Sequence, residues 1–342
     1  MTERPGFSNS AETQDPAPSG PDVRESVFAS EPWLAALHRA YGYRPVFYPA
    51  SASPGGALAV CEVKSRLTGR RWISVPFADH CEPGVADPAA LNEILRRFLA
   101  DSAVRRSRYV ELRPLSERWH EPLLALGFAP SAQFWYHEID LRPGVETLWG
   151  NLHASSIRRK VRRAEREGLE LRKGNNEELL REYYRLHLRT RRRQGVPPQP
   201  FRWFRILGEA FGERLRVYLA LFEGQPVSGI VTLRWGTTLV YKYGASDERW
   251  NQLGGNPFLM WRAMEEGCSA GLETFDLGRT DLHNPGLVQY KERLGGVRRG
   301  LIYFRAPASA ATSTPANVPA VWRRLPLPLL RLAGWLLYQH MA

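Results

Sequence analysis

Two spacings of hydrophobic residues run through this chain, and each predicts a different kind of element. Apolar residues that recur every three or four positions predict helices, and short apolar runs or alternation at every second position predict strands. In the first half these spacings predict helices over 32–38, 88–99 and 119–126 and strands over 57–63, 72–77, 109–112 and 134–139.

The second half predicts a strand meander, a helix and further strands. Strands are expected over 217–222, 227–235, 239–245, 274–277 and 301–304, and helices near 145–149 and over 257–270 and 287–294. In both halves a glycine turn opens a strand, and a loop, a helix and a strand ending in an acidic residue and arginine follow. The turns begin at Gly69 and Gly236, and the strand ends are Glu111-Leu112-Arg113 and Asp276-Leu277-Gly278-Arg279. This shared order suggests a duplicated α/β unit.

The ends of the chain differ in composition from these two units. Residues 1–24 are rich in Pro, Ser, Gly and acidic residues and predict a disordered tail, and 307–320 has the composition of a linker. We therefore expect an N-terminal domain over 25–144 and a C-terminal domain over 145–306. The segment 321–342 predicts an amphipathic helix that either docks on the protein, the favoured alternative, or lies in a membrane interface.

The charge of the chain favours an anionic partner without identifying it. The sequence has 342 residues, 43% of them hydrophobic, and a net charge of +12, and 42 of its 47 basic residues are arginine. Residues 155–193 alone carry 14 Arg and Lys against 6 Glu. A coding bias toward arginine explains the composition equally well. The functional alternative is a polyanionic partner such as tRNA, a phosphate-rich cofactor or an anionic membrane.

Cysteine content and hydropathy indicate the compartment. The three scattered cysteines, Cys61, Cys81 and Cys268, fit neither a disulfide scaffold nor a zinc site, so we expect no metal. The N-terminus has no apolar signal segment, and no run of 18 apolar residues predicts a spanning helix. A cytoplasmic protein is expected, with peripheral contact to the inner membrane as an alternative.

A Gly-Gly loop before a predicted helix has the features of an anion site. Asn256 is expected to cap the helix and Pro257 to occupy its first position. Free backbone N–H groups at a helix start bind phosphates, and neighbouring glycines permit close approach. The candidate cofactor-binding residues are therefore Gln252, Gly254, Gly255 and Asn256. The alternative is a plain turn before a well-capped helix.

Several stretches carry, in their order, a resemblance to a known family. They are Pro76-Phe77-Ala78-Asp79, the basic segment 155–169, Tyr241-Lys242-Tyr243-Gly244 running on to Asn256 and Trp261, Phe275-Asp276-Leu277-Gly278-Arg279, and Tyr290-Lys291 followed by Leu294-Gly295-Gly296. Together they resemble the Fem-type aminoacyltransferases and the related BioF-like acetyltransferase domains of the GNAT superfamily. The resemblance covers roughly residues 30–306. It departs from the family pattern at Tyr290, where the family has Phe, and in the spacing of the glycine loop.

The resemblance implies both a fold and a set of site residues. The expected fold is α/β, with two tandem GNAT-like domains, each a mixed sheet flanked by helices, and a cleft between them. The implied catalytic residues are Lys291, Asp276 and Tyr241, and the implied substrate-binding residues are Arg158, Arg162, Lys242 and Arg279. Their structural alternatives are an ordinary exposed lysine, a buried ion pair and a solvated basic helix face. Lone histidines, including His80, are assigned no role.

The leading functional hypothesis is an acyltransferase that acts on an amine or hydroxyl of a cell-envelope or polysaccharide-related acceptor, either a small molecule or lipid-linked. Acyl-CoA, such as acetyl-CoA, is the favoured donor, because the loop suits a pyrophosphate and the coiled-coil insertion of some Fem enzymes is absent. The alternative donor is aminoacyl-tRNA, with a peptidoglycan precursor as acceptor, and the basic segment favours it. A third hypothesis is a non-catalytic polyanion-binding or membrane-peripheral scaffold, for which only charge argues.

Overall fold

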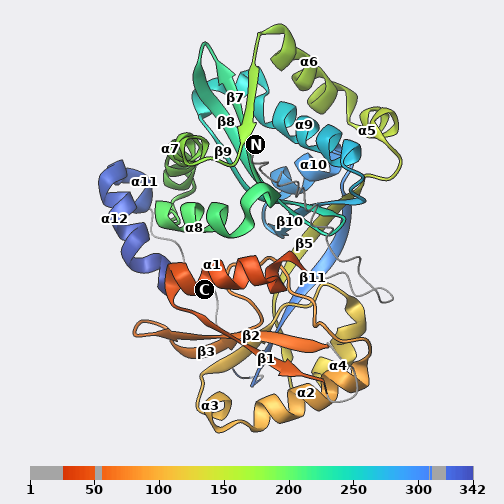
Figure 1. The fold of residues 1–342 in the computed structure, drawn as a ribbon, viewed down its shortest axis with the longest axis vertical. Coiled ribbons are helices and arrows are strands. Elements are labelled where there is room, and N and C mark those ends of the chain that lie inside the picture. Colours follow the sequence, from red (N-terminus) through yellow and green to blue (C-terminus); the bar gives the residue numbers. More distant parts are fainter. Residues whose placement is uncertain (1–25, 51–55, 308, 310–320, 342) are drawn as a thin grey trace, which may run out of the picture.

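One mixed sheet organises the molecule. The computed structural model describes residues 26–50, 56–307, 309 and 321–341; the predicted tail over 1–24 and most of the predicted linker lie outside the described residues. The described strands form a sheet of eleven in the order β1-β2-β3-β4-β11-β5-β10-β9-β8-β7-β6 (Figure 1). Their bounds are β1 Arg44–Pro49, β2 Ala57–Ser65, β3 Gly69–Ile73, β4 Tyr109–Leu112, β5 Ala129–Asp140, β6 Glu170–Gly174, β7 Leu215–Phe222, β8 Gln225–Trp235, β9 Thr238–Ser246, β10 Thr274–Asp281 and β11 Val297–Ala306.

The sheet contains the same strand pattern twice. β1, β2 and β3 form an antiparallel meander, and β3 then runs parallel to β4. β6 to β9 form a second meander, and β9 runs parallel to β10. The parallel registers correspond, because Arg71 lies opposite Tyr109 in the first half and Thr238 opposite Thr274 in the second. The predicted α/β fold with two tandem GNAT-like units is confirmed.

Two long strands connect the halves in the middle of the sheet. β5 and β11 pair with each other along most of their length. On its other side β5 pairs with β10, while β11 pairs with β4. Each half is therefore completed by a strand that follows the other half in sequence, and the two meanders share one continuous hydrogen-bonded sheet.

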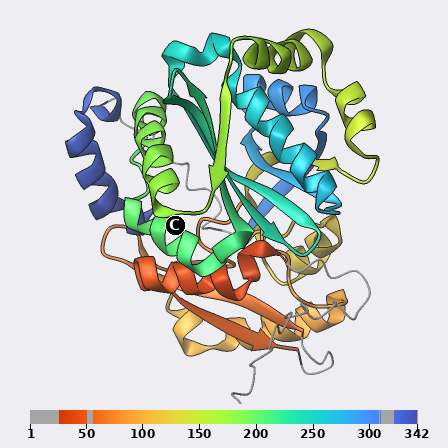
Figure 2. The ribbon, with the colours of Figure 1, turned by 45° about the horizontal axis from the view of Figure 1, so that its top comes forward.

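Helices pack on the sheet and form three hydrophobic clusters with it. α1 and α8 pack on each other between the halves, and α7 lies beside them (Figures 1 and 2). α5, α6, α9 and α10 cover the opposite face of the second half, and α2 and α4 cover the first half. The bounds are α1 Glu31–Tyr41, α2 Pro88–Ala100, α3 Ser102–Arg105, α4 His120–Ala125, α5 Val145–Asn151, α6 Arg159–Arg166, α7 Glu177–Gln194, α8 Phe201–Phe211, α9 Gly255–Ser269, α10 Pro285–Arg293, α11 Val321–Arg324 and α12 Leu327–Leu337.

Local chemistry explains why several of these helices begin and end where they do. Asp87 caps α2, since its carboxylate accepts a hydrogen bond from the Ala90 N–H at 2.9 Å. Asn176 caps α7 through the Leu179 N–H, also at 2.9 Å, and α7 ends where Gly195 takes a left-handed conformation. α7, α8 and β1 lie outside the predicted set of elements. α7 is rich in Arg and Tyr, which hides its buried face from a hydrophobicity pattern.

Two local predictions are wrong. α9 begins at Gly255 and is capped by Gly254 in a left-handed conformation. Asn256 and Pro257 therefore lie inside the first turn rather than at the cap and the first helical position, respectively. Asn256 instead directs its side chain at the Tyr290 hydroxyl, which donates a hydrogen bond to it. The expected single helix over 321–342 is two helices, because Pro326 is extended and has no N–H with which to continue the first.

Candidate functional site

The candidate site lies where β9 and β10 separate. The two strands pair only over Thr238–Val240 and Thr274–Asp276, and beyond these residues they no longer share hydrogen bonds. A bulge follows on β9, where Val231 lies opposite Tyr243 and Thr232 opposite Tyr241, so that Lys242 has no partner residue. Tyr241 therefore packs with the cluster under α9, while the Lys242 side chain enters the space between the halves.

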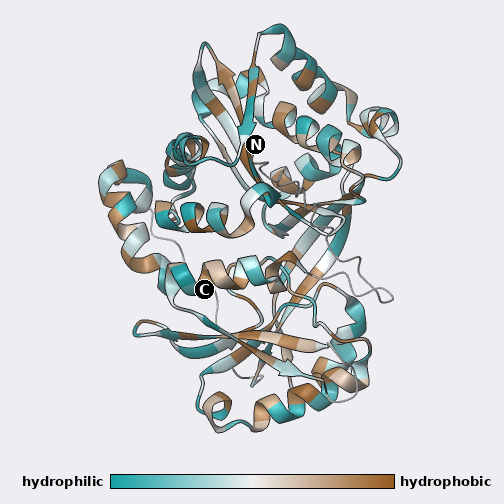
Figure 3. Ribbon diagram, viewed as in Figure 1, coloured by the Kyte–Doolittle hydropathy of each residue, from teal (hydrophilic) through white to brown (hydrophobic). Residues whose placement is uncertain are grey.

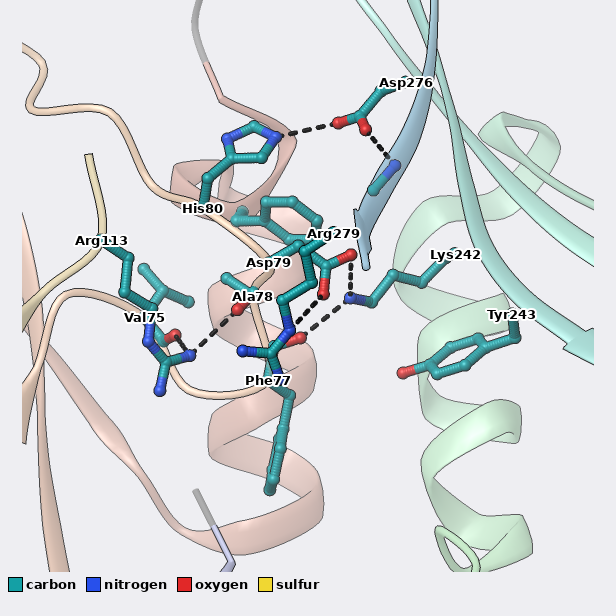
Figure 4. A network of polar contacts seen from close by, with 12 residues as sticks. Val75, Phe77, Ala78, Asp79, His80, Arg113, Lys242, Tyr243, Asp276 and Arg279 are labelled. Carbon is teal, nitrogen blue, oxygen red and sulfur yellow. Dashed lines mark hydrogen bonds and ion pairs between the residues drawn. The ribbon is translucent and has the colours of Figure 1, made fainter. Parts of the chain in front are cut away.

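A loop from the first half reaches this opening. It contains Phe77, whose φ of 60° is unusual for a bulky residue and costs on the order of 1 kcal/mol. The Phe77 carbonyl accepts a hydrogen bond from Lys242 Nζ at 2.9 Å (Figure 4). The ammonium also lies 4.7 Å from the ring centre of Phe28. Burial lowers the pKa of Lys242, although Asp79 opposes this effect.

Asp79 joins the cations of the second half to this loop. Its carboxylate lies 3.6 Å from Lys242 Nζ and 3.7 Å from Arg279 Nε. Burial by itself would raise the pKa of Asp79, but the two cations lower it overall. Gly278 makes the approach possible, because a Cβ at that position would stand 2.7 Å from the Asp79 carboxylate, and its φ of 70° is left-handed. Arg279 also donates to the Tyr303 hydroxyl at 2.9 Å.

His80 and Asp276 form a second contact between the halves. His80 Nε2 lies 2.9 Å from the Asp276 carboxylate, which also accepts the Gly278 N–H at 2.6 Å (Figure 4). The His80 side chain is 10% exposed, and its Nδ1 has no hydrogen-bond partner among the described residues. Burial alone would lower the pKa of His80, but the hydrogen bond and charge of Asp276 raise it overall. Asp276 therefore fixes the His80 ring through Nε2, in either protonation state of the imidazole, and leaves Nδ1 without a hydrogen-bond partner among the described residues.

Lys291 lies behind the same strand end. Its Nζ donates to the Gly278 carbonyl at 2.9 Å and to the Arg279 carbonyl at 3.0 Å, and the residue is 3% exposed. Burial lowers its pKa to about 8. The alternative of an ordinary exposed lysine is therefore wrong for this residue. In this structure Lys291 braces the Gly278–Arg279 backbone from α10.

Two cavities open on opposite sides of the separated strands. The larger, about 900 Å³, lies between the halves and is lined by residues of both, including His80, Tyr136, Asp276 and Arg299. The smaller, about 230 Å³, lies at the start of α9 and is lined by Lys160, Ser228, Ser246, Trp250, Asn251, Gly255, Asn256 and Tyr290, among others. One cavity therefore reaches Asp276, and the other reaches the residue that precedes Lys291.

The predicted cofactor loop only partly lines the smaller cavity. Gly255 and Asn256 lie on its wall, whereas Gln252 is exposed and Gly254 faces α6. A Cβ on Gly254 would stand 2.6 Å from the Lys160 carbonyl, and one on Gly255 would stand 2.9 Å from Ser228 Cβ. Both glycines therefore allow α9 to pack closely against α6 and β8, and Gly255 also lies on the cavity wall.

α6 and the turn before it bring one of the basic residues, Lys160, to the wall of the smaller cavity. Lys160 lines it, and Arg158 and Arg162 lie on the same helical segment, with Arg162 5.7 Å from the Trp149 ring centre. Arg158, Arg159 and Lys160 have no carboxylate partner within the described ranges, whereas Arg163 pairs with Glu167. This stretch therefore presents uncompensated positive charge.

The first half contains a filled version of the same opening. At its equivalent strand end Arg113 donates to the Ala78 carbonyl at 2.9 Å (Figure 4). Arg113 also pairs with Glu111 at 2.7 Å. Glu111 also pairs with Arg305 of β11 at 2.6 Å. The Arg113 guanidinium and its buried partners therefore occupy this strand end in the first half.

The sequence predicted most, but not all, of these site residues. The structure gathers Lys242, Asp276, Arg279 and Lys291 at one strand end, while Tyr241 lies under α9 beside Asn256. Asp79 and His80 were missing from the predicted site. The signal for them was the Pro-Phe-Ala-Asp stretch, because His80 directly follows Asp79. Among the described residues no group of three or more His, Cys, Asp or Glu side chains is placed to hold a metal ion.

The fold and site define a two-unit GNAT-type protein, and comparison with known proteins narrows the class. Residues 153–292 match the family described as "Acetyltransferase (GNAT) domain". Over 140 residues the chain is 25% identical to the UDP-N-acetylmuramoylpentapeptide-lysine N(6)-alanyltransferase of Weissella viridescens. That match covers 41% of this chain and 39% of the relative, so the chain matches less than half of that protein's length.

Solved structures support the same class at the level of the fold. The crystal structure of FemX has a TM-score of 0.64 at 15% identity and covers 80% of this chain and 90% of that one. The structure of L-PGS from Bacillus licheniformis has a TM-score of 0.55 at 14% identity and covers 88% and 92%. The resemblance to Fem-type proteins of the GNAT superfamily is confirmed. No helix within the described residues is long and apolar enough to cross a membrane.

Proposed function

We propose that this chain is an acyltransferase that takes an aminoacyl group from aminoacyl-tRNA and transfers it to an amine of a peptidoglycan-precursor peptide. The relative from Weissella viridescens, by its name, transfers alanine to the lysine N6 of such a precursor. The observation that carries the proposal is the small cavity at the start of α9, with Lys160 of α6 on its wall and further basic residues in the same segment.

The size of this cavity favours a donor that inserts only its acylated end. Ligand pockets that enclose a whole drug-sized molecule measure about 300–1,000 Å³, and this cavity has about 230 Å³. An aminoacyl-tRNA would place its terminal aminoacyl ester in the cavity and its phosphates on Arg158, Arg159 and Lys160. Acyl-CoA, the donor favoured by the sequence, would need more of its length enclosed.

In this proposal the larger cavity binds the acceptor. An amine that enters it would lie against His80, whose ring Asp276 fixes through Nε2 and whose buried Nδ1 has no hydrogen-bond partner among the described residues. His80 would take a proton from the amine as the C–N bond forms and the ester C–O bond to the ribose breaks. The ribose oxygen then takes up a proton, so that the transfer is balanced. General-base help of this kind contributes about 10²- to 10⁴-fold.

The cations at the strand end have supporting roles in this scheme. Lys242 and Arg279 hold Asp79 and thereby the loop that carries His80. Lys291 holds the Gly278–Arg279 backbone, whose amide and carbonyl groups border the opening. We assign Tyr241 and Asn256 to the donor cavity, because both lie against Tyr290 on the α9 side.

The experiment is a transfer assay with labelled aminoacyl-tRNA and UDP-N-acetylmuramoyl-pentapeptide, run beside acetyl-CoA. We expect label in the peptide, with complete loss after ribonuclease treatment of the donor. His80→Gln, which keeps a partner for Asp276 but cannot accept a proton, should lower kcat about a hundredfold or more and remove the acidic limb of the pH profile. Transfer from acetyl-CoA with release of free coenzyme A, and none from aminoacyl-tRNA, would reject the donor assignment.

A further inference from the structure

The C-terminal segment is fastened to the protein by one face only. Leu330, Gly334 and Tyr338 are buried and recur every four residues, on one side of α12 and its continuation. Gly334 packs so closely on α7's end loop that a Cβ would stand 2.2 Å from the Pro198 carbonyl. The Tyr338 ring lies 4.8 Å from that of Phe77. α12 is therefore a docked helix at the edge of the molecule (Figure 1).

The opposite face of α12 is apolar and exposed. Leu329 and Leu332 are each 52% exposed, Trp335 is 61% exposed and Leu336 is 48% exposed. Their spacing of three and four residues places them along one side of the helix. Figure 3 shows the hydrophobic colouring of α12 at the margin of the molecule, where no other described element covers this side. A row of large apolar side chains on a helix that is already docked needs a further environment.

The surroundings of this face are positively charged and contain no acid from the same segment. The chain has no Asp or Glu after Glu292. Arg323 and Arg324 are exposed on α11 and have no carboxylate partner in the part of the chain that the structure describes. Arg323 lies against Gly195 at the end of α7, whose last turn carries three more arginines. Arg323 and Arg324, which precede the apolar row in the chain, therefore carry charge that no described carboxylate neutralises, whereas Arg193 of α7 pairs with Glu248 at 3.8 Å.

We infer that this face of α12, with Arg323 and Arg324 beside it, docks on an anionic lipid bilayer. Leucine and tryptophan on one side of a helix, flanked by arginine, are suited to the boundary between headgroups and acyl chains. A second copy of the chain fits less well. A two-fold contact through α12 would bring the same arginines of both copies together. The inference goes beyond the proposed function, and it is tested without donor or acceptor.

The test is flotation of the full chain with vesicles of phosphatidylcholine that contain phosphatidylglycerol, compared with phosphatidylcholine alone. We expect binding to the anionic vesicles that weakens as salt is added. The double variant Leu332→Ser/Trp335→Ser should bind about tenfold or more weakly, because it removes apolar surface from the membrane side. The matched control Leu124→Ser, on α4 and 50% exposed, should bind like the wild type.

A charge variant tests the second part of the inference. Arg323→Glu/Arg324→Glu should lower binding to the anionic vesicles about tenfold or more and remove much of its salt dependence. Arg105→Glu/Arg106→Glu, exposed residues at the end of α3 in the first half, is the matched control. Wild-type chain that does not float with anionic vesicles would overturn the inference. So would a dimer, seen by light scattering, that Leu332→Ser/Trp335→Ser converts to monomer without any change in flotation.

Discussion

The buried ammonium of Lys291 makes the stability of this protein depend on pH in a predictable direction. In the folded chain its pKa is about 8, against 10.5 for an ordinary lysine, because burial disfavours the charged form. Between these values the unfolded chain binds more protons than the folded chain, so raising the pH favours folding. At about 1.4 kcal/mol for each pKa unit, the difference corresponds to about 3 kcal/mol.

The perturbation is Lys291→Met, which keeps the length of the side chain and removes the titrating group. The assay is urea unfolding of wild type and variant at a series of pH values from 7 to above 10. At pH 7 both states of the wild type carry the charge, so the full cost of burying it is present. That cost disappears as the pH rises from about 8 to 10.5.

The comparison isolates Lys291, since other groups titrate alike in both proteins. The free energy of unfolding of wild type relative to Lys291→Met should therefore rise by about 3 kcal/mol across this window. The same slope is expected when the midpoints are measured by fluorescence or by circular dichroism. A difference that stays constant from pH 7 to 10.5 would refute the reasoning, because the lysine would then have the same pKa folded and unfolded.

Three further predictions follow from the contacts at the strand end and the loop. Asp79→Asn should destabilise the fold by about 3 kcal/mol in urea titrations, because it leaves a buried ammonium without its carboxylate; loss of under 0.5 kcal/mol would show that the pair is not needed. Gly255→Ala should cost about 1–3 kcal/mol through its contact with Ser228, and Ser228→Gly in the same chain should restore most of it; an additive double variant would disprove the contact. Arg158→Glu/Arg162→Glu should raise the KM for aminoacyl-tRNA more than it lowers kcat and reduce the salt dependence; an unchanged KM would make this surface a solvated face.

Strong local patterns let the sequence determine much of the fold. The meander of β7, β8 and β9 and the helix α2 with its Asp87 cap follow from spacing and from side chains within a few residues. The order of motifs likewise led to the GNAT superfamily and to Lys242, Asp276, Arg279 and Lys291 as site residues, although it assigned them to two different roles. The hydrophobic pattern did not predict α7, because the buried face of this helix contains tyrosine and histidine as well as leucine.

Only the tertiary structure decided which groups meet at the site and what they do there. His80 and Asp276 are 196 positions apart, and no local pattern distinguishes this histidine from the others. The close packing of Gly254 against Lys160 of α6 and of Gly255 against Ser228 of β8 also depends on elements that are remote in sequence. The sequence identified Lys291 as a site residue. Its low pKa and its two carbonyl partners, however, depend on the strand that packs over it. Hydrogen bonding and desolvation depend on neighbours in space, so they emerge only when the two halves close into one sheet.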